Sequence, residues 1–207
     1  MTGTGDRPQY VARQKRRADT HERVIQVAAD LLYRRGIQQV SMDDVAAAAQ
    51  VTKATLYKHF SSKDALISEC LDVVDLEHFT WFVSQVEQRT TGGAPALSAV
   101  FDVLDQWINS SAFQGCAFIN ASIQLPDHQH PAFLAVLNHK DRTRRWLVTL
   151  ATEEGIPAES AELIGSHLML LMEGAIVTAL VQGRADAGKE AGDVAQIVLQ
   201  AMANPRK

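Results

Sequence analysis

The sequence of 207 residues has only two cysteines, Cys70 and Cys116, and they lie far apart in the chain. A zinc site or a disulfide framework needs cysteines at paired spacing, so the sequence predicts neither. A glycine-rich phosphate loop, an HExxH pattern and a nucleophile with its base at motif spacing are also missing. We therefore expect no enzyme activity, no cofactor and no metal ion, and we interpret both cysteines as small apolar packing residues.

The N-terminal stretch MTGTGDRPQYVARQKRR lacks the basic and apolar pattern of an export leader, so we expect a cytoplasmic protein. No segment shows the alternation of apolar and polar residues that predicts a strand, and no internal repeat occurs. Helical periodicity is found in almost every part of the chain. The sequence therefore predicts an all-α fold.

The net charge of -4 is an average over two unlike parts of the chain. Residues 1–63 contain eleven Lys or Arg and six Asp or Glu, a net charge of +5. Residues 64–207 contain nine and eighteen, a net charge of -9. A positive segment joined to an acidic body indicates an anion-binding end, and such a field turns that end toward DNA.

The first predicted helix runs from Asp19 to Arg35. Its apolar residues follow the i, i+3, i+4, i+7, i+8 spacing of a one-sided stripe. Asp19 and Glu22 have the spacing of a capping box, and Gly36 supplies the stop.

Two short helices are predicted next. One begins at Ser41, whose hydroxyl caps the helix while Asp44 reaches back to it. The other runs from Lys53 to about Phe60 and has Thr52 as its cap.

A capping box of Ser61 and Asp64 predicts a long fourth helix that reaches roughly Arg89 and ends before TTGGAP. Further helices are predicted at about residues 95–111, 115–124, 131–154, 159–182 and 187–203.

The third helix has two unlike faces. At about a hundred degrees per residue, Leu56 and Phe60 share one side. The outward side is small, polar and basic, with Ala54 and Lys58 flanked by Thr55 and Tyr57. A helix-turn-helix places such a face in the major groove, where lysine donates to guanine or to phosphate.

Residues 18–66, ADTHERVIQVAADLLYRRGIQQVSMDDVAAAAQVTKATLYKHFSSKDAL, resemble the three-helix DNA-binding domain of the TetR family of bacterial transcriptional regulators. The helix that ends at Gly36, the Ser before the second helix and TLYKHF before Lys-Asp-Ala-Leu occur in the family's order and spacing. Gln50 and Ala54 depart from the family, which commonly has Gly at both positions. Gln50 can adopt the left-handed conformation at a cost of about 1 kcal/mol. The resemblance implies a homodimer whose C-terminal helical domain binds a small molecule and thereby controls DNA affinity.

We therefore predict three parts: a flexible basic arm at 1–17, a DNA-binding domain at 18–66 with its helix-turn-helix motif at about 41–60, and a ligand-binding and dimerisation domain at 67–207. In the arm, RQKRR at 13–17 is either a solvated tail or a contact to the minor groove or to phosphate. The predicted DNA contacts are Ser41, Thr52, Lys53, Ala54, Thr55, Tyr57, Lys58, His59 and Lys63.

In the C-terminal part, GCAFINASIQLPDHQHPAF at 115–133 resembles a segment that recurs in regulatory domains of the family. Aromatic residues of the C-terminal part supply either a packed interior or the lining of an effector pocket, and a few polar groups there could orient a bound ligand. The candidate ligand-binding residues are Trp81, Phe82, Phe101, Trp107, Phe118, Asn120, Gln124 and His167.

Asp127, His128 and His130 lie close together in DHQHP, with His139 on the following helix, and this grouping suggests a metal ion. An open loop lacks the supporting contacts that fix metal ligands, so we interpret the segment as a solvated loop.

The stretch LIGSHLMLLMEGAIVTALV at 163–181 is apolar on nearly every face and, at nineteen residues, is long enough to suggest a membrane span. His167 and Glu173 would then lie in hydrocarbon, so we expect no membrane insertion. We expect instead a four-helix bundle formed by the last two helices and the same pair of a second subunit. The predicted interface residues are Gly165, Leu168, Met172, Ala175, Ile176, Ala179, Val194, Ile197, Val198 and Ala201.

The sequence thus predicts a one-component regulator, a repressor that a small hydrophobic or aromatic effector releases from a palindromic double-stranded DNA operator. A ligand that promotes DNA binding remains an alternative. So do a DNA-binding protein that is controlled by a protein partner or by no ligand, and a helical enzyme.

Overall fold

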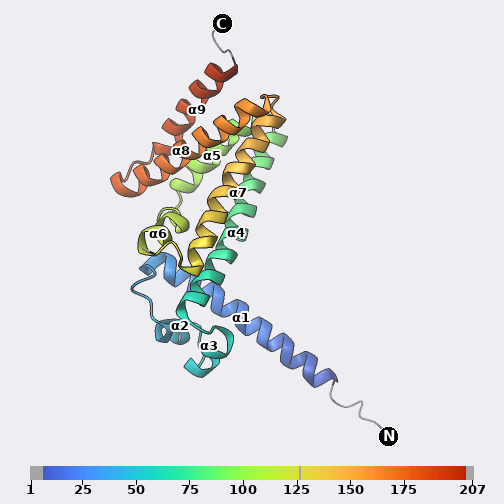
Figure 1. Ribbon diagram of the computed structural model, residues 1–207, viewed down its shortest axis with the longest axis vertical. Coiled ribbons are helices and arrows are strands. Elements are labelled where there is room, and N and C mark those ends of the chain that lie inside the picture. Colours follow the sequence, from blue (N-terminus) through green and yellow to red (C-terminus); the bar gives the residue numbers. More distant parts are fainter. Residues whose placement is uncertain (1–6, 126, 204–207) are drawn as a thin grey trace. The chain divides into compact units, whose positions relative to one another are not determined.

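The computed structural model in Figure 1 describes residues 7–125 and 127–203, and side chains from residue 18 to residue 202 apart from 126. This described part of the chain has nine α-helices and no strand, which confirms the predicted all-α fold. The helices are α1 (Arg7–Arg35), α2 (Met42–Ala48), α3 (Lys53–His59), α4 (Lys63–Thr91), α5 (Ala96–Ile108), α6 (Ala117–Gln124), α7 (Pro131–Glu153), α8 (Ala158–Gln182) and α9 (Ala187–Ala203).

The chain divides into two compact units that interleave in sequence. The first unit comprises the chain up to Val74 together with Ala121–Ala135, and the second comprises Asp75–Asn120 together with the chain from Val136 onward. Helices α4, α6 and α7 each contribute residues to both units. The predicted boundary after residue 66 lies inside α4.

Helix α1 begins at Arg7 and not at Asp19, so residues 7–17 of the predicted flexible arm are helical. The reason is that no glycine or proline occurs between Pro8 and Gly36, and proline is tolerated in the first turn of a helix. Asp19 therefore lies within the helix and cannot cap it. Residues 1–6 lie outside the described residues.

The apolar stripe of α1 forms the core of the first unit with residues from α2, α3 and α4. Val24 and Ala28 have no exposed surface, and α1 ends as predicted at Gly36, whose φ is 86°. The buried residues of this core are Val24, Ile25, Ala28, Val40, Met42, Val45, Ala46, Ala49, Leu56, Phe60, Leu66 and Cys70.

Helix α4 is capped by Ser62 and not by the predicted Ser61. The backbone N–H of Ala65 donates to Ser62 Oγ at 3.1 Å, and that of Leu66 donates to the Ser62 carbonyl at 3.2 Å. Either serine can act as a cap, and the burial of Leu66 and Cys70 sets the register in which Ser62 takes that position.

In the second unit, α9 packs closely on α5 because glycines face that helix. A Cβ atom at Gly188 would lie 2.6 Å from Asp105 Cα, and one at Gly192 would lie 3.0 Å from Phe101 Cβ. Helix α8 is, within the described residues, the one helix whose length and composition would allow it to cross a membrane. One face of α8 is nevertheless buried in this unit by Ile164 and Leu168, as expected for a core helix.

Candidate nucleic-acid interface

Helix α3 has a polar and basic exposed face because its apolar residues anchor the opposite side. Leu56 and Phe60 are 0% and 1% exposed in the core of the first unit. Thr52 caps the helix by accepting a hydrogen bond from the Thr55 N–H at 3.1 Å. The exposed residues at α3 are Thr52, Lys53, Ala54, Tyr57 and Lys58, and Thr55 and His59 are partly buried.

Charge along α3 suits contact with a polyanion. Its first turn contains no Asp or Glu, and its last turn contains Lys58 and His59. A phosphate that approaches the positive N-terminal end of the helix therefore meets no carboxylate in that turn. The His59 ring lies 5.6 Å from the ring of His21, which stacks on Phe60 at 4.7 Å, so aromatic contacts restrict it.

A tight turn joins α2 to α3. Gln50 has a φ of 53° and is the one non-glycine residue with positive φ in the described part of the chain, which confirms its left-handed conformation. Its N–H donates to the Ala47 carbonyl at 3.1 Å, and the Val51 N–H donates to the Ala46 carbonyl at 2.9 Å. These bonds satisfy carbonyls at the end of α2 and fix the direction in which α3 leaves the turn.

Ser41 holds the start of α2. Its hydroxyl accepts a hydrogen bond from the Asp44 N–H at 3.1 Å, and its own N–H donates to Asp44 Oδ2 at 2.8 Å, which confirms the predicted capping box. Hydrogen bonds from the side chain and backbone of Ser41 hold the pKa of Asp44 below its usual value. The Ser41 hydroxyl is thus engaged within the protein.

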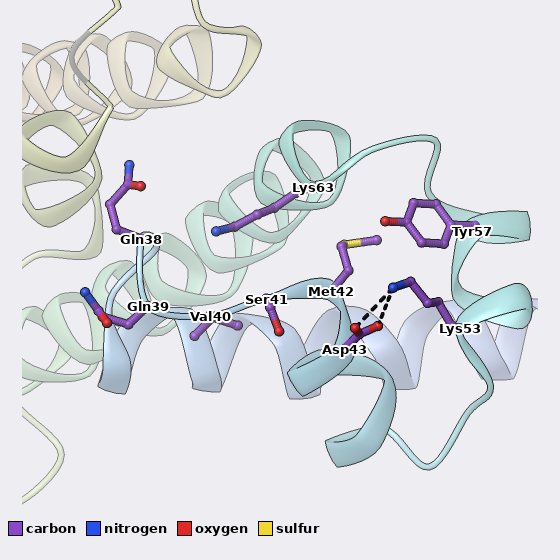
Figure 2. A pocket seen from close by; sticks show the side chains of 9 residues that line it. All are labelled: Gln38, Gln39, Val40, Ser41, Met42, Asp43, Lys53, Tyr57 and Lys63. Carbon is purple, nitrogen blue, oxygen red and sulfur yellow. Dashed lines mark hydrogen bonds and ion pairs between the residues drawn. The ribbon is translucent and has the colours of Figure 1, made fainter.

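A shallow recess of about 370 Å³ lies beside α3. Figure 2 shows Tyr57 and Lys53 of α3 close to the first turn of α2 in this recess. The recess is lined by Gln38, Gln39, Val40, Ser41, Met42, Asp43, Lys53, Tyr57 and Lys63. Amide, hydroxyl and ammonium groups of this kind are typical donors to the phosphate oxygens of DNA.

Both lysines of the recess also have protein partners. Lys53 Nζ lies 2.9 Å from Asp43 Oδ1, and its hydrogen bond with Asp43 raises the pKa of Lys53. Lys63 Nζ donates to the Ile37 carbonyl at 2.6 Å, a bond that ties the start of α4 to the loop before α2. An ammonium has three donors, so each lysine can keep these partners while it donates to a phosphate.

The predicted ligand-binding residues fall into three groups. Trp81, Phe82 and Trp107 belong to an aromatic group in the second unit, in which Trp81 and Phe82 are 6.0 Å apart between ring centroids. Phe101 and Phe118 are core residues at 3% and 2% exposure.

The three polar candidates do not converge. Asn120 Nδ2 donates to the Gln114 carbonyl at 2.9 Å, and His167 lies partly buried on α8. Gln124 belongs to the first unit, where its carbonyl accepts a bond from Gln38 Nε2 at 2.8 Å. It therefore contacts the loop before α2.

Two members of the aromatic group were missed from the sequence. The His78 ring lies 4.7 Å from Trp107 and 5.6 Å from Trp81, and Trp146 lies 6.0 Å from Phe82. Burial lowers the pKa of His78 to about 4, and its buried Nε2 has no hydrogen-bond partner among the described residues. The available signal was spacing, since His78 precedes Trp81 and Phe82 by three and four positions on one helix face.

The histidines near DHQHP have separate environments. His130 Nε2 lies 3.3 Å from Asp64 Oδ1, and the His128 ring stacks on Phe133 at 4.3 Å. His139 Nδ1 lies 2.6 Å from Asp75 Oδ1. Across the described residues, no three His, Cys, Asp or Glu side chains are grouped as a metal ion requires.

The six interface residues predicted on α8 face the interior of the single chain. Gly165, Leu168, Met172, Ala175, Ile176 and Ala179 are all buried in the single chain. A Cβ at Gly165 would lie 2.5 Å from Val148 Cγ2, so this glycine brings α8 close to α7. The sequence could not indicate which of two apolar faces packs inward. The exposed face of α8 carries other apolar residues, namely Leu163, Leu170, Val177 and Val181.

On α9, the predicted residues remain accessible. Val194 and Ile197 are 39% and 65% exposed, Ala201 is exposed, and Val198 is partly buried. The exposed residues of α8 and α9 therefore provide apolar surface that no other described residue of the single chain covers.

Comparison with known proteins links these features to a family. A family model described as "Bacterial regulatory proteins, tetR family" matches residues 24–70, which include α2, α3 and the turn between them. The chain is 42% identical to the uncharacterized HTH-type transcriptional regulator YdeS of Bacillus subtilis over 50 residues, which span 24% of this chain and 25% of YdeS. It is 24% identical to the HTH-type transcriptional regulator YjdC of Escherichia coli over 164 residues, 77% of this chain and 83% of YjdC.

The similarity to solved structures extends over nearly the whole chain. A TetR-family transcriptional regulator from Streptomyces coelicolor is 30% identical, with a TM-score of 0.76 over 90% of this chain and 97% of that chain. A TetR-family regulator from Cytophaga hutchinsonii has the same TM-score of 0.76 at 17% identity, over 90% of this chain and 96% of that one, and shares the fold.

Proposed function

Because this chain belongs to the TetR family of bacterial regulatory proteins, and is thus a DNA-binding transcriptional regulator, we propose that it acts as a ligand-controlled repressor. In this proposal a homodimer binds a palindromic operator in the cytoplasm, and a small hydrophobic or aromatic effector releases it. The family acts in transcription and not in catalysis.

The observation that carries the proposal is the exposed face of α3. Leu56 and Phe60 fix the helix, and the bonds around Gln50 fix its direction, so Ala54, Tyr57 and Lys58 are held ready for the major groove. In the recess beside α3, Lys53, Lys63 and Tyr57 are suited to phosphate and supply affinity that does not depend on sequence.

A dimer is part of the proposal because one seven-residue recognition helix covers too little DNA for tight binding. Two copies that engage half-sites about 34–36 Å apart combine their binding energies. The uncovered apolar faces of α8 and α9 supply the surface for this pairing, through Leu170 and Val177 on one helix and Val194 and Ile197 on the other.

The effector is proposed to bind at the aromatic group of the second unit. Trp81, Trp107 and Trp146 offer apolar walls, and the unpartnered Nε2 of His78 offers a single polar contact to a guest. An effector of this kind should change tryptophan fluorescence, because the three tryptophans of the chain all lie in this group.

Selection from a library of random duplexes with the full chain is the direct test. We expect enriched sites to have twofold symmetry, with half-site centres about one helical turn apart. Enrichment of no sequence, or of sites without symmetry, would contradict the proposed dimeric operator complex.

The effector proposal is tested separately by a screen for compounds that change tryptophan fluorescence, followed by titration of the operator complex. Compounds that release the operator support a ligand-controlled repressor, whereas compounds that strengthen the complex indicate a corepressor. If fluorescence-active compounds leave operator affinity unchanged, ligand control is wrong.

A further inference from the structure

Cys116 occupies the residue before α6, at the positive end of that helix. The Asn120 N–H donates to the Cys116 carbonyl at 2.9 Å, and the Ile119 backbone is hydrogen-bonded to the thiol. Gly115, with a φ of 83°, directs the chain into this position, and a Cβ there would lie 2.8 Å from Leu180 Cδ2. A sulfur at a helix N-terminus is stabilised as a thiolate.

A histidine contacts this sulfur, and a carboxylate contacts the histidine. His139 is hydrogen-bonded to the Cys116 thiol, and on its other side His139 Nδ1 lies 2.6 Å from Asp75 Oδ1. Phe118 stacks on the His139 ring at 3.8 Å and holds its plane. A nucleophile next to a base that a third group orients is the arrangement that activates side chains for reaction.

A lysine completes the surroundings of the sulfur. Lys140 Nζ lies 3.8 Å from Cys116 Sγ and 2.8 Å from Glu173 Oε1. The Lys140 side chain is 23% exposed, whereas Cys116 is 6% exposed. The Cys116 thiol is thus nearly buried beside a lysine whose side chain is partly exposed.

The two cysteines of the chain differ in the direction of their pKa shifts. Burial alone would raise the pKa of Cys116. The hydrogen bond with His139 and the charge of Lys140 lower this pKa by more than burial raises it, so the pKa lies below its usual value. At Cys70, burial raises the pKa to about 12, and the thiol donates a hydrogen bond to the Ile25 carbonyl at 3.7 Å. Cys70 thus serves as an internal control.

We propose that Cys116 is a modification site at which hydrogen peroxide, or another peroxide of similar size, oxidises the thiolate to a sulfenic acid, and that this oxidation weakens operator binding. The second half rests on the proposed function. In the step, the sulfur attacks one peroxide oxygen, an S–O bond forms and the O–O bond breaks. The sulfur loses two electrons to the peroxide, and the departing hydroxide takes a proton from the imidazolium of His139 and leaves as water.

The expected effect on DNA binding follows from where α6 ends. Oxidation replaces a charged sulfur by a larger neutral group, so the contacts to His139 and Lys140 that depend on the thiolate weaken. At the other end of α6, Gln124 accepts a hydrogen bond from Gln38 in the loop before α2. A shift of α6 that breaks this bond disturbs the loop that leads into the helix-turn-helix.

The chemical arm of the test uses the full chain and does not involve DNA. Protein treated with hydrogen peroxide and then with dimedone, which traps sulfenic acids, is digested and analysed by mass spectrometry. We expect the adduct at Cys116 and not at Cys70, and we expect the Cys70→Ala variant to react like the wild type. Alkylation of Cys116 by iodoacetamide should have a pH midpoint below the value of about 8.5 of a free thiol, and His139→Gln should raise that midpoint. Equal reactivity of the two cysteines, or a midpoint that His139→Gln leaves unchanged, would overturn the assignment.

The DNA arm measures operator affinity before and after peroxide treatment, and again after reduction by dithiothreitol. We expect the Kd of the Cys70→Ala variant to rise about tenfold or more and to recover on reduction, whereas the Kd of Cys116→Ser should not respond to peroxide. Oxidation at Cys116 without a change in Kd would refute the regulatory half. Absence of operator binding by the untreated protein would instead refute the proposed function, and the chemical arm would stand on its own.

Discussion

Gln50 carries a backbone conformation that an L-residue other than glycine adopts at a cost. Its φ of 53° lies in the left-handed region, where glycine has no steric penalty. We expect Gln50→Gly to raise the free energy of unfolding by roughly 0.5–1 kcal/mol, measured by urea denaturation. Ala49→Gly is the matched control, because Ala49 has an ordinary φ of -78° and should lose stability on the same exchange. Destabilisation by both changes would show that the Gln50 side chain contributes more than its backbone conformation costs.

Lys58 lies on the exposed face of α3, in its last turn. If it reads a base edge, Lys58→Ala should weaken operator binding by about 1–3 kcal/mol, with a smaller loss on random duplex. If it contacts phosphate alone, the loss should be uniform across sequences, and the salt dependence should become shallower. Anisotropy titrations on both duplexes at several salt concentrations distinguish these outcomes. Lys189→Ala, which removes an exposed lysine on α9, should leave binding unchanged, and if Lys58→Ala also does, α3 is not the recognition helix.

His78 makes the stability of the protein sensitive to acid. Its pKa is about 4 in the folded state against 6.5 for an ordinary histidine, so the unfolded chain binds a proton in this range that the folded chain does not. The contribution of neutral His78 to the free energy of unfolding is therefore fully present above pH 6.5. It is lost as the pH drops toward 4, by at most roughly 3 kcal/mol.

We expect His78→Phe, which keeps an aromatic ring beside Trp107, to flatten the fall in unfolding free energy between pH 6.5 and 4. His128→Phe, in an exposed loop, should keep the slope of the wild type. Parallel slopes for all three proteins in denaturant titrations would show that His78 is not the group responsible.

At the scale of the element, capping contacts give the sharpest comparison between neighbouring positions. Ser62 Oγ accepts a hydrogen bond from the Ala65 N–H at the start of α4, whereas the sequence equally permits Ser61 in this role. Ser62→Ala should lower the free energy of unfolding by about 1 kcal/mol, and Ser61→Ala should change it by less than about 0.5 kcal/mol. A larger loss at Ser61 would place the cap one residue earlier.

The sequence predicted the helices well where capping and stop residues agree with the hydrophobic periodicity. Gly36 ends α1, Ser41 and Thr52 cap α2 and α3, and α9 has the residue range that its pattern indicates. The predicted start of α1 was wrong. A capping pattern at Asp19 competes with a preceding run of helix-forming residues that contains no helix-breaking residue. When two local signals for a helix start have similar strength, the sequence alone does not show which one is used. Packing in the folded protein decides between them.

The site was predictable in part for the same reason. The division of α3 into a buried and an exposed face follows from helical geometry, so Ala54, Tyr57 and Lys58 could be placed from the sequence. The partners of Lys53 and Lys63 could not, since Asp43 and the Ile37 carbonyl become neighbours only when the helices pack. The surroundings of Cys116 could not be predicted either, since His139 and Lys140 are 23 and 24 positions away in the chain.

At the scale of the whole molecule, the interleaving of the two units provides a route for control. Residues 121–135 belong to the unit that contains the helix-turn-helix, although chain segments of the second unit precede and follow them. The Gln38 contact to Gln124 and the His130 contact to Asp64 hold this segment on the first unit. Helices α6 and α7 each have residues in both units. A ligand that moves either helix in the second unit would therefore also move its residues in the first unit.

Dimerisation is the whole-molecule property on which the proposed operator binding depends. Helix α8 has two apolar faces, and the one that contains Leu168, Met172 and Ala175 is buried within the protomer. The opposite face repeats at seven-residue spacing through Leu163, Leu170 and Val177, which a partner helix can cover along a single seam.

We expect Leu170→Arg combined with Val177→Arg to yield monomers, because two unpaired guanidinium groups would have to be buried in the seam. Helical content should remain that of the wild type, since both positions are exposed in the single chain, at 66% and 40%. Leu76→Arg is the matched control: Leu76 is 62% exposed on α4, so this change alters charge and apolar surface outside the proposed seam. Sedimentation velocity and circular dichroism of all three proteins at micromolar concentration test the seam.

Operator affinity should fall with the monomeric variant alone, because a monomer engages one half-site and loses the energy of the second. A wild type that sediments as a monomer, or a double variant that remains dimeric, would place the subunit contact on another surface.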